Sequence, residues 1–200
     1  DHQLTEYKKA IEKFEAYKLY PKFKHTASTA ASILYSDTHF DLARTGIGLY
    51  GLWPSEDTRG RAQHRVKLEP VLTWKTMVAQ VKNVKRGTPV SYGLTERVRR
   101  DSKVAVLPIG YADGFDRVAN SKRGHVLIGG KRCKVLGRVC MNMTMVDVTD
   151  VAKVKAEDEV VLIGKQGKER IAAEELAALG KTINYEIVTR INWDIPRRLI

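Results

Sequence analysis

Beyond residue 70 the sequence consists of short apolar segments separated by turn residues, and this spacing constrains the fold more than any other feature. The clearest case is the apolar segment 126–128, followed by Gly129-Gly130 and then by residues 133–139. Two such segments around a pair of glycines are typical of a β-hairpin. Further strands are expected at residues 71–84, 103–109, 143–148 and 159–163. About six short strands with turns between them predict a β-barrel or a β-sandwich.

One helix is expected to interrupt this β-rich region. Residues 172–179 are rich in alanine, glutamate and leucine, and Gly180 follows them directly. Glycine is favoured just after a helix because it adopts the left-handed conformation at no steric cost. We therefore predict a helix that Gly180 terminates.

The first 62 residues follow a different pattern. Leu4, Tyr7, Ile11 and Phe14 recur at steps of three and four, which predicts a helix over residues 3–18. A short strand is expected at 22–26, a helix at 28–35 and a second, strand-like segment from residue 40 that leads into a glycine loop. This alternation is typical of an α/β unit.

The predicted fold class is therefore mainly β with an α/β start. The polar segment 53–70, which contains Pro54, Gly60 and Pro70, is the expected domain boundary. We expect one domain over residues 1–62 and a second, β domain over residues 63–200.

The chain has a net charge of +12, and residues after position 62 carry almost all of it. Such a charge permits the binding of an anionic partner. A solvated basic surface is the favoured explanation of this charge, and an anionic small-molecule ligand is the next. Aromatic residues make up 8% of the chain, and no strand alternates basic and aromatic residues as a nucleic-acid stacking surface would.

No apolar run approaches the roughly 20 residues that span a bilayer. The two cysteines, Cys133 and Cys140, lack histidines at metal-binding spacing, so no metal site is predicted and a reducing cytoplasm is the simplest setting.

Two tyrosines adjoin glycines at the ends of apolar segments, in Tyr92-Gly93 and Gly110-Tyr111. Glycine allows a turn that can project a phenol into a cleft. An ordinary tyrosine at a strand end, bonded to the backbone, is the competing interpretation. Because a phenol has a pKa near 10, a tyrosine that acts as a base needs cationic surroundings.

The loop Gly46-Ile47-Gly48 is a candidate phosphate-binding segment. Its backbone N–H groups, together with the hydroxyl of Thr29, can surround an anion. A tight turn accounts for the glycines equally well, and Arg44 just before the loop fits an ordinary ion pair. Near the C-terminus, Tyr185 is a third tyrosine able to reach a polar ligand.

Several segments, in this order, resemble the C-terminal half of bacterial alanine racemases. They are His25-Thr26-Ala27-Ser28-Thr29-Ala30-Ala31, Arg44-Thr45-Gly46-Ile47-Gly48-Leu49-Tyr50-Gly51, Val90-Ser91-Tyr92-Gly93, Gly110-Tyr111-Ala112-Asp113-Gly114-Phe115, Gly137-Arg138-Val139-Cys140-Met141 and Ile183-Asn184-Tyr185-Glu186. The resemblance implies the end of a (β/α)8 barrel followed by a C-terminal β-barrel domain, in a homodimer that uses pyridoxal 5′-phosphate and shares each active site between its subunits.

The resemblance also implies roles for individual residues. Thr29, the amides of Gly46 and Ile47 and the hydroxyl of Tyr185 would hold the cofactor phosphate, as their counterparts do in the family. Arg44 would contact the pyridine nitrogen, with His25 orienting it. Tyr92 would be one of two acid/base groups and would act on the partner subunit's cofactor. Tyr111 would line the entrance, and the Met141 backbone would bind the substrate carboxylate.

The chain also departs from the family pattern. The lysine that carries the cofactor and serves as the second base has no counterpart in these 200 residues. We therefore expect the chain alone to be inactive and to be part of a longer cytoplasmic enzyme that interconverts L- and D-alanine. Asn142 replaces an aspartate and Asp194 an arginine, so serine or another small amino acid stays open as substrate. A non-catalytic dimerisation module and a basic, polyanion-binding β-barrel are the alternative functions.

Overall fold

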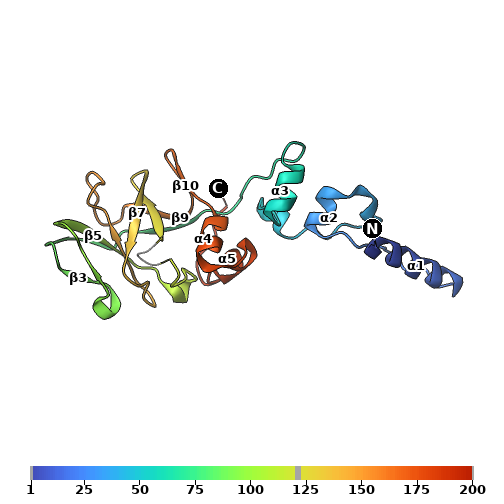
Figure 1. Ribbon diagram of the computed structural model, residues 1–200, viewed down its shortest axis with the longest axis horizontal. Coiled ribbons are helices and arrows are strands. Elements are labelled where there is room, and N and C mark those ends of the chain that lie inside the picture. The colour runs from blue at the N-terminus through green and yellow to red at the C-terminus, as the bar shows by residue number, and fades with distance from the viewer. Residues whose placement is uncertain (1, 120–122, 200) are drawn as a thin grey trace. The chain divides into compact units, whose positions relative to one another are not determined.

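The structure is a computed structural model that describes residues 2–119 and 123–199 (Figure 1). Its contacts divide the chain into two compact units, residues 1–71 and residues 72–200. The division between Val71 and Leu72 falls at the end of the polar segment in which the sequence places the boundary. Each unit is described by itself.

The first unit is mostly helical. Its elements are α1 (His2–Ala16), α2 (Thr29–Leu34), η1 (Ser36–Thr38), η2 (Ile47–Tyr50) and α3 (Glu56–Ala62). The helices predicted at 3–18 and 28–35 are confirmed by α1 and α2. Helix α3 begins at the N-cap Ser55, whose Oγ accepts a hydrogen bond from Thr58 N–H at 3.1 Å. Such a cap satisfies one of the free donors at a helix start.

The strands predicted around residues 22–26 and 40–44 are wrong as regular strands. A single parallel bridge joins Ser28 to Arg44, with the Arg44 N–H donating to Ala27 O at 2.9 Å. A second contact runs from Asp41 N–H to Lys24 O at 3.0 Å. A strand requires a continuous ladder, and here the two segments are parallel but meet only at these points. Helix α2 lies between them in sequence, as in a βαβ connection.

The second unit is built around an antiparallel sheet. Its strands are β1 (Trp74–Met77), β2 (Gln80–Val84), β5 (Ser102–Leu107), β6 (His125–Ile128), β7 (Lys131–Leu136), β8 (Thr144–Asp147), β9 (Glu159–Gln166) and β10 (Glu169–Ile171). They follow the order β1-β9-β6-β7-β8-β5-β2, with β10 added to β9. Short β3 (Pro89–Val90) and β4 (Glu96–Arg97) form a separate pair.

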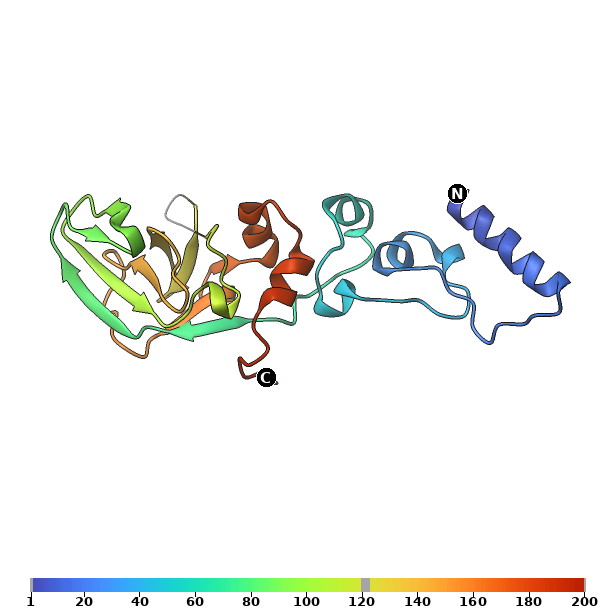
Figure 2. The same ribbon diagram turned by 90° about the horizontal axis from the view of Figure 1, so that it is seen from below.

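The sheet closes on itself through β1 and β2. The sequence predicts one strand over 71–84, but this segment changes partner midway: β1 pairs with β9 and β2 with β5. The change falls where Val78 N–H donates to Asp158 O at 2.9 Å and Ala79 N–H donates to Val106 O at 2.8 Å. Because the two ends of the sheet are consecutive parts of the chain, the sheet is a barrel (Figures 1 and 2).

The predicted hairpin is confirmed by β6 and β7. Val126 pairs with Cys133 and Ile128 with Lys131, so Gly129 and Gly130 form the turn. Their φ angles are +58° and +74°. Two positive φ angles match the right-handed twist of a hairpin and favour glycine at both positions.

The barrel interior is filled by side chains that alternate along its strands. Val126, Ile128, Val135, Val146 and Leu162 are fully buried. The Trp74 ring packs edge-on against Phe115, with centroids 6.1 Å apart. Burial of each large apolar side chain contributes roughly 1.5–3 kcal/mol to folding.

Two helices end the chain, α4 (Ala173–Gly180) and α5 (Asn184–Arg190), and they lie together at one end of the barrel (Figures 1 and 2). The prediction that Gly180 follows the helix is wrong by one position. Gly180 is still helical, and Lys181 takes the left-handed conformation with φ +51°. The turn falls there because Thr182 N–H reaches back to Ala177 O at 3.0 Å.

Arg132 fastens α4 to the barrel. Its guanidinium donates to Glu169 on β10 at 3.0 Å and to Glu175 on α4 at 2.6 Å. A planar guanidinium that bridges two carboxylates fixes direction as well as distance. Over the described ranges 2–119 and 123–199, no helix is long and apolar enough to cross a membrane.

Cys133 supplies a test of the barrel interior. Burial raises the pKa of its thiol from the usual 9.0 to about 11, and the side chain is 2% exposed. A thiol alkylated at about pH 8 in native protein should therefore be Cys140, which is half-buried, whereas Cys133 should react only after unfolding. Mass mapping of the alkylated sites measures this.

The same shift predicts how stability depends on pH. The folded state holds the Cys133 proton more tightly than the unfolded state does, so the contribution to stability is intact below pH 9.0 and is lost as the pH rises toward about 11. A Cys133→Ala variant should lack this component of the alkaline loss. Equal alkylation rates for both thiols in native protein would contradict the buried position.

Candidate functional site

Thr29 and the glycine loop form one cluster in the first unit. Thr29 begins α2, is 4% exposed, and its Oγ1 accepts a hydrogen bond from Gly46 N–H at 2.9 Å, with a longer contact to Gly48 N–H at 3.5 Å. Thr29 and Gly46 directly follow the two parallel segments that meet at Ser28 and Arg44. Ligands of α/β folds bind at such carboxyl ends of parallel strands.

The cluster has the chemistry of an anion cradle. The Thr29 hydroxyl accepts from the loop, so its own proton is available to an outside acceptor. Over residues 2–119 and 123–199, no acceptor is found for Ile47 N–H. A Cβ on Gly46 would meet nothing within 4 Å, whereas one on Gly48 would lie 2.7 Å from Thr29 Cγ2. Open space lined by donors fits a phosphate group.

Arg44 extends this cluster with an uncompensated charge. Its backbone is held at Ala27, and its Nη2 donates only a long bond, 3.3 Å, to Thr26 O. In the described part of the chain, no carboxylate lies within ion-pair distance of it. The competing interpretation of Arg44 as a member of an ion pair is therefore not realised within this unit.

His25 is exposed, and the structure holds it through its backbone. The His25 N–H donates to the Tyr7 hydroxyl at 2.9 Å. No hydrogen bond joins its ring to Arg44 among the described residues. The role of His25 in orienting Arg44 stays a prediction.

Tyr92 lies in the second unit, on the turn η3 (Tyr92–Leu94) that directly follows β3. Its side chain is 70% exposed. The neighbouring residue Ser91 is buried, and a Cβ on Gly93 would lie 3.3 Å from the Arg138 guanidinium. The phenol is thus exposed on a turn that is anchored at Ser91 and whose Gly93 lies close to Arg138.

Tyr111 and Met141 are brought together by backbone pairing. The turn η4 (Tyr111–Asp113) lies against the Cys140-Met141 segment: Tyr111 N–H donates to Cys140 O and Ala112 N–H to Met141 O, both at 3.0 Å. A Cβ on Gly110 would stand 2.2 Å from Cys140 O, so only glycine permits this approach. The Arg117 guanidinium lies 5.8 Å from the Tyr111 ring centre, a cation–π distance.

Tyr185 lies in the first turn of α5 and is partly exposed. Partial burial raises the pKa of its phenol above the usual 10.0. The hydroxyl therefore keeps its proton at neutral pH and can donate a hydrogen bond. This protonation state suits contact with an anion.

Sequence reasoning missed two supports of the Tyr111 turn. The Asp113 carboxylate accepts a hydrogen bond from Gly110 N–H at 2.8 Å, which closes the turn around Tyr111. Its carbonyl accepts from Asn192 N–H at 3.1 Å, which ties the C-terminal segment to the same turn. The three-residue spacing of Gly110 and Asp113 was a visible signal for the first contact. No local sequence pattern indicates the second contact, from Asn192 to Asp113.

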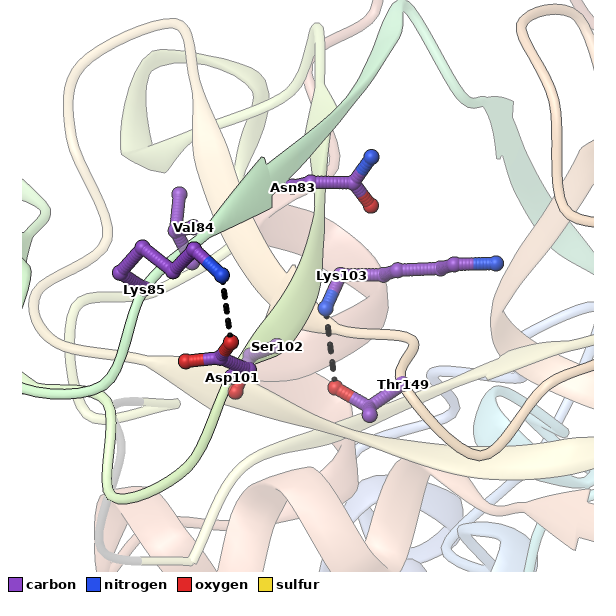
Figure 3. Close-up of a pocket in the computed structure, with 7 residues that line it drawn as sticks. All are labelled: Asn83, Val84, Lys85, Asp101, Ser102, Lys103 and Thr149. Atoms are coloured by element: carbon purple, nitrogen blue, oxygen red, sulfur yellow. Dashed lines mark hydrogen bonds and ion pairs between the residues drawn. The ribbon is translucent and has the colours of Figure 1, made fainter.

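Two surface pockets of the barrel contain none of the predicted site residues. The pocket in Figure 3, of about 420 Å³, is lined by Asn83, Val84, Lys85, Asp101, Ser102, Lys103 and Thr149. Lys85 Nζ donates to Asp101 at 2.8 Å, and this bond with the Arg86 N–H holds the pKa of the Asp101 carboxyl below its usual value. These charges compensate each other, as expected of surface ion pairs.

Comparison with known proteins accounts for both units. Residues 71–199 match the family described as alanine racemase, C-terminal domain, and residues 1–54 match alanine racemase, N-terminal domain. The alanine racemase of Halothermothrix orenii is 43% identical over 195 residues, which cover 98% of this chain and 50% of that protein.

Solved structures of alanine racemases are also similar to this chain. Alanine racemase from Bacillus anthracis with bound L-Ala-P superposes with a TM-score of 0.88 at 38% identity, over 95% of this chain and 48% of that one. Alanine racemase from Bartonella henselae with covalently bound pyridoxal phosphate gives 0.79 at 31% identity, over 96% and 49%.

The fold and the matched segments define an isomerase family that depends on pyridoxal phosphate. The chain belongs to the alanine racemase family. It spans about half the length of the curated relatives it matches. The predicted fold class is confirmed by these matches.

The contact between Gly48 and Thr29 can be tested by substitution. Gly48→Ala places a methyl group 2.7 Å from Thr29 Cγ2, and because Thr29 is buried and β-branched, it can yield only by turning its hydroxyl away from Gly46. We expect a loss of about 1–3 kcal/mol in the free energy of unfolding, measured in urea.

Gly60→Ala is the matched control. Gly60 lies in α3, and a Cβ there would meet nothing within 4 Å. Alanine should stabilise this helix by up to about 1 kcal/mol. Equal stability of the two variants would show that the Thr29 contact is not tight.

Proposed function

We propose that this chain supplies the C-terminal half of a homodimeric, cytoplasmic alanine racemase that interconverts L- and D-alanine with pyridoxal 5′-phosphate. The observation that carries the proposal is the Thr29–Gly46 cradle, where a buried hydroxyl lies against a glycine loop that has open space at Gly46. The assembled, cofactor-loaded protein is called the holoenzyme below. The titles of the relatives, which include L-Ala-P and covalently bound pyridoxal phosphate, support the choice of substrate and cofactor.

The phosphate would be held by Thr29 Oγ1, the amides of Gly46 and Ile47, and the protonated hydroxyl of Tyr185. All of them are neutral donors, and an anion strengthens each such bond. When bound, pyridoxal phosphate withdraws electrons from the substrate's α carbon and so makes its hydrogen acidic.

Arg44 would face the pyridine nitrogen of the cofactor. Among the described residues 2–119 and 123–199 its guanidinium has no carboxylate partner, so its charge is available. A cation at this nitrogen disfavours nitrogen protonation. That favours return of a proton to the same carbon over side reactions such as transamination.

Tyr92 would move the proton on one face of the α carbon. Racemisation needs one acid/base group on each face, since a single group can only return the proton to the side it left. Tyr92 is exposed on a turn beside Arg138, which suits a phenol that reaches into the site of the partner subunit. The second group would be the cofactor-bearing lysine of the family, which has no counterpart in this chain.

Met141 and Tyr111 would bind and orient the substrate. The Cys140 and Met141 carbonyls are taken up by Tyr111 and Ala112 N–H groups. No acceptor is found for Met141 N–H across residues 2–119 and 123–199, so it is available to a substrate carboxylate. Tyr111, held by this pairing and by Arg117, would line the entrance.

The phosphate contact is tested by Thr29→Val. Valine keeps the shape of threonine but removes the hydroxyl, and a hydrogen bond to a charged group is worth about 1.5–3 kcal/mol. We expect pyridoxal phosphate to dissociate roughly 10- to 100-fold more readily, as measured by spectroscopic titration. Thr29→Ser keeps the hydroxyl and should bind normally. Unchanged affinity in Thr29→Val would remove Thr29 from the phosphate site.

The proton-transfer role is tested by Tyr92→Phe in the holoenzyme. Loss of one general acid/base should lower racemisation by about 10²–10⁴. In D₂O, one alanine enantiomer should still exchange its α hydrogen without inversion, because the second base remains. Proton NMR with chiral chromatography follows both processes. An unchanged racemisation rate would exclude Tyr92 as a catalytic residue.

A further inference from the structure

We propose that Ser91 is a positioning residue that holds Tyr92 at the angle its proton transfer requires, and that Gly137 provides the space for it. This inference rests on the proposed function of Tyr92. It concerns the buried end of the turn rather than the phenol itself, and it follows from contacts within the second unit alone.

The turn that carries Tyr92 has an unusual backbone. Ser91, Gly93 and Leu94 all have positive φ, at +66°, +74° and +52°. Glycine adopts such angles without steric strain, whereas in serine and leucine they are strained by the Cβ atom. Strained residues of this kind persist only where the surrounding structure fixes them, and they gather at functional sites. The strain on either side of Tyr92 therefore requires an anchor.

Ser91 makes that anchor with its side chain and its backbone. Its Oγ donates to Arg138 O at 2.6 Å, and its N–H points to Met145 Sδ at 3.3 Å. The residue is 8% exposed, whereas Tyr92 beside it is 70% exposed. The two neighbours thus differ in exposure, with Ser91 buried against the barrel wall and Tyr92 carried outward.

Gly137 is shaped to receive Ser91. It has φ +66°, and a Cβ built on it would lie 2.4 Å from Ser91 Cβ and 2.9 Å from Ser91 Oγ. Ser91 therefore occupies the volume that a side chain at residue 137 would need. Because Gly137 follows β7 directly, its contact with Ser91 fixes Ser91 against the barrel wall.

The anchor rests on an apolar base. Val90 on β3 packs with Val98, Val104 and Leu136, and Met145 lies against the same cluster. The hydrogen bond to Arg138 adds a directional contact to this packing. Proton transfer depends on such direction: a misplacement of about 1 Å can cost roughly 10²-fold in rate.

The test separates positioning from simple stabilisation by measuring a ratio. In Ser91→Ala holoenzyme in D₂O, we compare α-hydrogen exchange without inversion with inversion itself. A misplaced Tyr92 transfers protons poorly on its own face of the α carbon, whereas transfer on the other face continues. The ratio of exchange without inversion to inversion should therefore rise about tenfold. We also expect kcat to fall by roughly 10- to 100-fold and KM to change little. The ratio does not depend on how much protein is folded, because both reactions occur on the same active molecules.

Ser102→Ala is the matched control. Ser102 is 6% exposed and its Oγ donates to Arg100 O at 2.8 Å, the same kind of bond in the same unit, with neither partner in the turn that carries Tyr92. We expect a similar fall in Tm and an unchanged ratio. Should Ser91→Ala not fold, Ser91→Gly also lacks the hydroxyl while accepting φ +66°, and it should raise the ratio likewise.

The outcomes distinguish the two proposals. If Tyr92→Phe abolishes inversion but the Ser91 variants leave the ratio unchanged, the positioning role is wrong and the proposed function stands. If Ser102→Ala raises the ratio as much as Ser91→Ala does, the effect is general and positioning is again wrong. If Tyr92→Phe itself racemises normally, the proposed function fails first.

Discussion

Closure of the antiparallel barrel is the constraint on which the second unit depends. Because β1 and β2 are consecutive and pair with opposite ends of the sheet, both edges are satisfied by the same piece of chain. A closed sheet has no edge strand to slip or to recruit another chain. The turns around Tyr111 and Met141 lie between strands of this wall, whereas the Tyr92 turn belongs to the separate β3–β4 pair and is joined to the wall by the hydrogen bond from Ser91 to Arg138 O.

The arginines separate structural from functional charge. Arg132 forms ion pairs with Glu169 and Glu175. Arg190 forms ion pairs with Asp116 and Glu186. Each arginine thus fastens a helix to the barrel. Among the residues that the structure describes, Arg44 has no such partner, and it lies just before the loop whose Gly46 N–H donates to Thr29. Arg132 and Arg190 therefore serve packing, whereas Arg44 offers its charge where an anionic ligand is proposed.

Local signals predicted local structure well. The Gly129-Gly130 pair predicted its hairpin, helical spacing predicted α1, and the glycines at positions 46 and 48 indicated the candidate phosphate-binding loop. What escaped prediction depends on distant partners. The change of pairing at Val78, and the bond from Ser91 to Arg138 across 47 residues of sequence, cannot be read from either segment alone. The strands around Arg44 failed for the same reason, because a strand exists only with its neighbours.

The central claim is that the phosphate loop of one subunit and Tyr92 of the other complete a single site, and subunit mixing tests it most directly. Arg44→Glu and Tyr92→Phe, each inactive alone, would be co-expressed with different tags and the mixed dimers assayed. If the site is shared, each mixed dimer has one intact site, and an equal mixture should regain about a quarter of the wild-type racemisation rate. No recovery, with mixed dimers demonstrably present, would contradict the account.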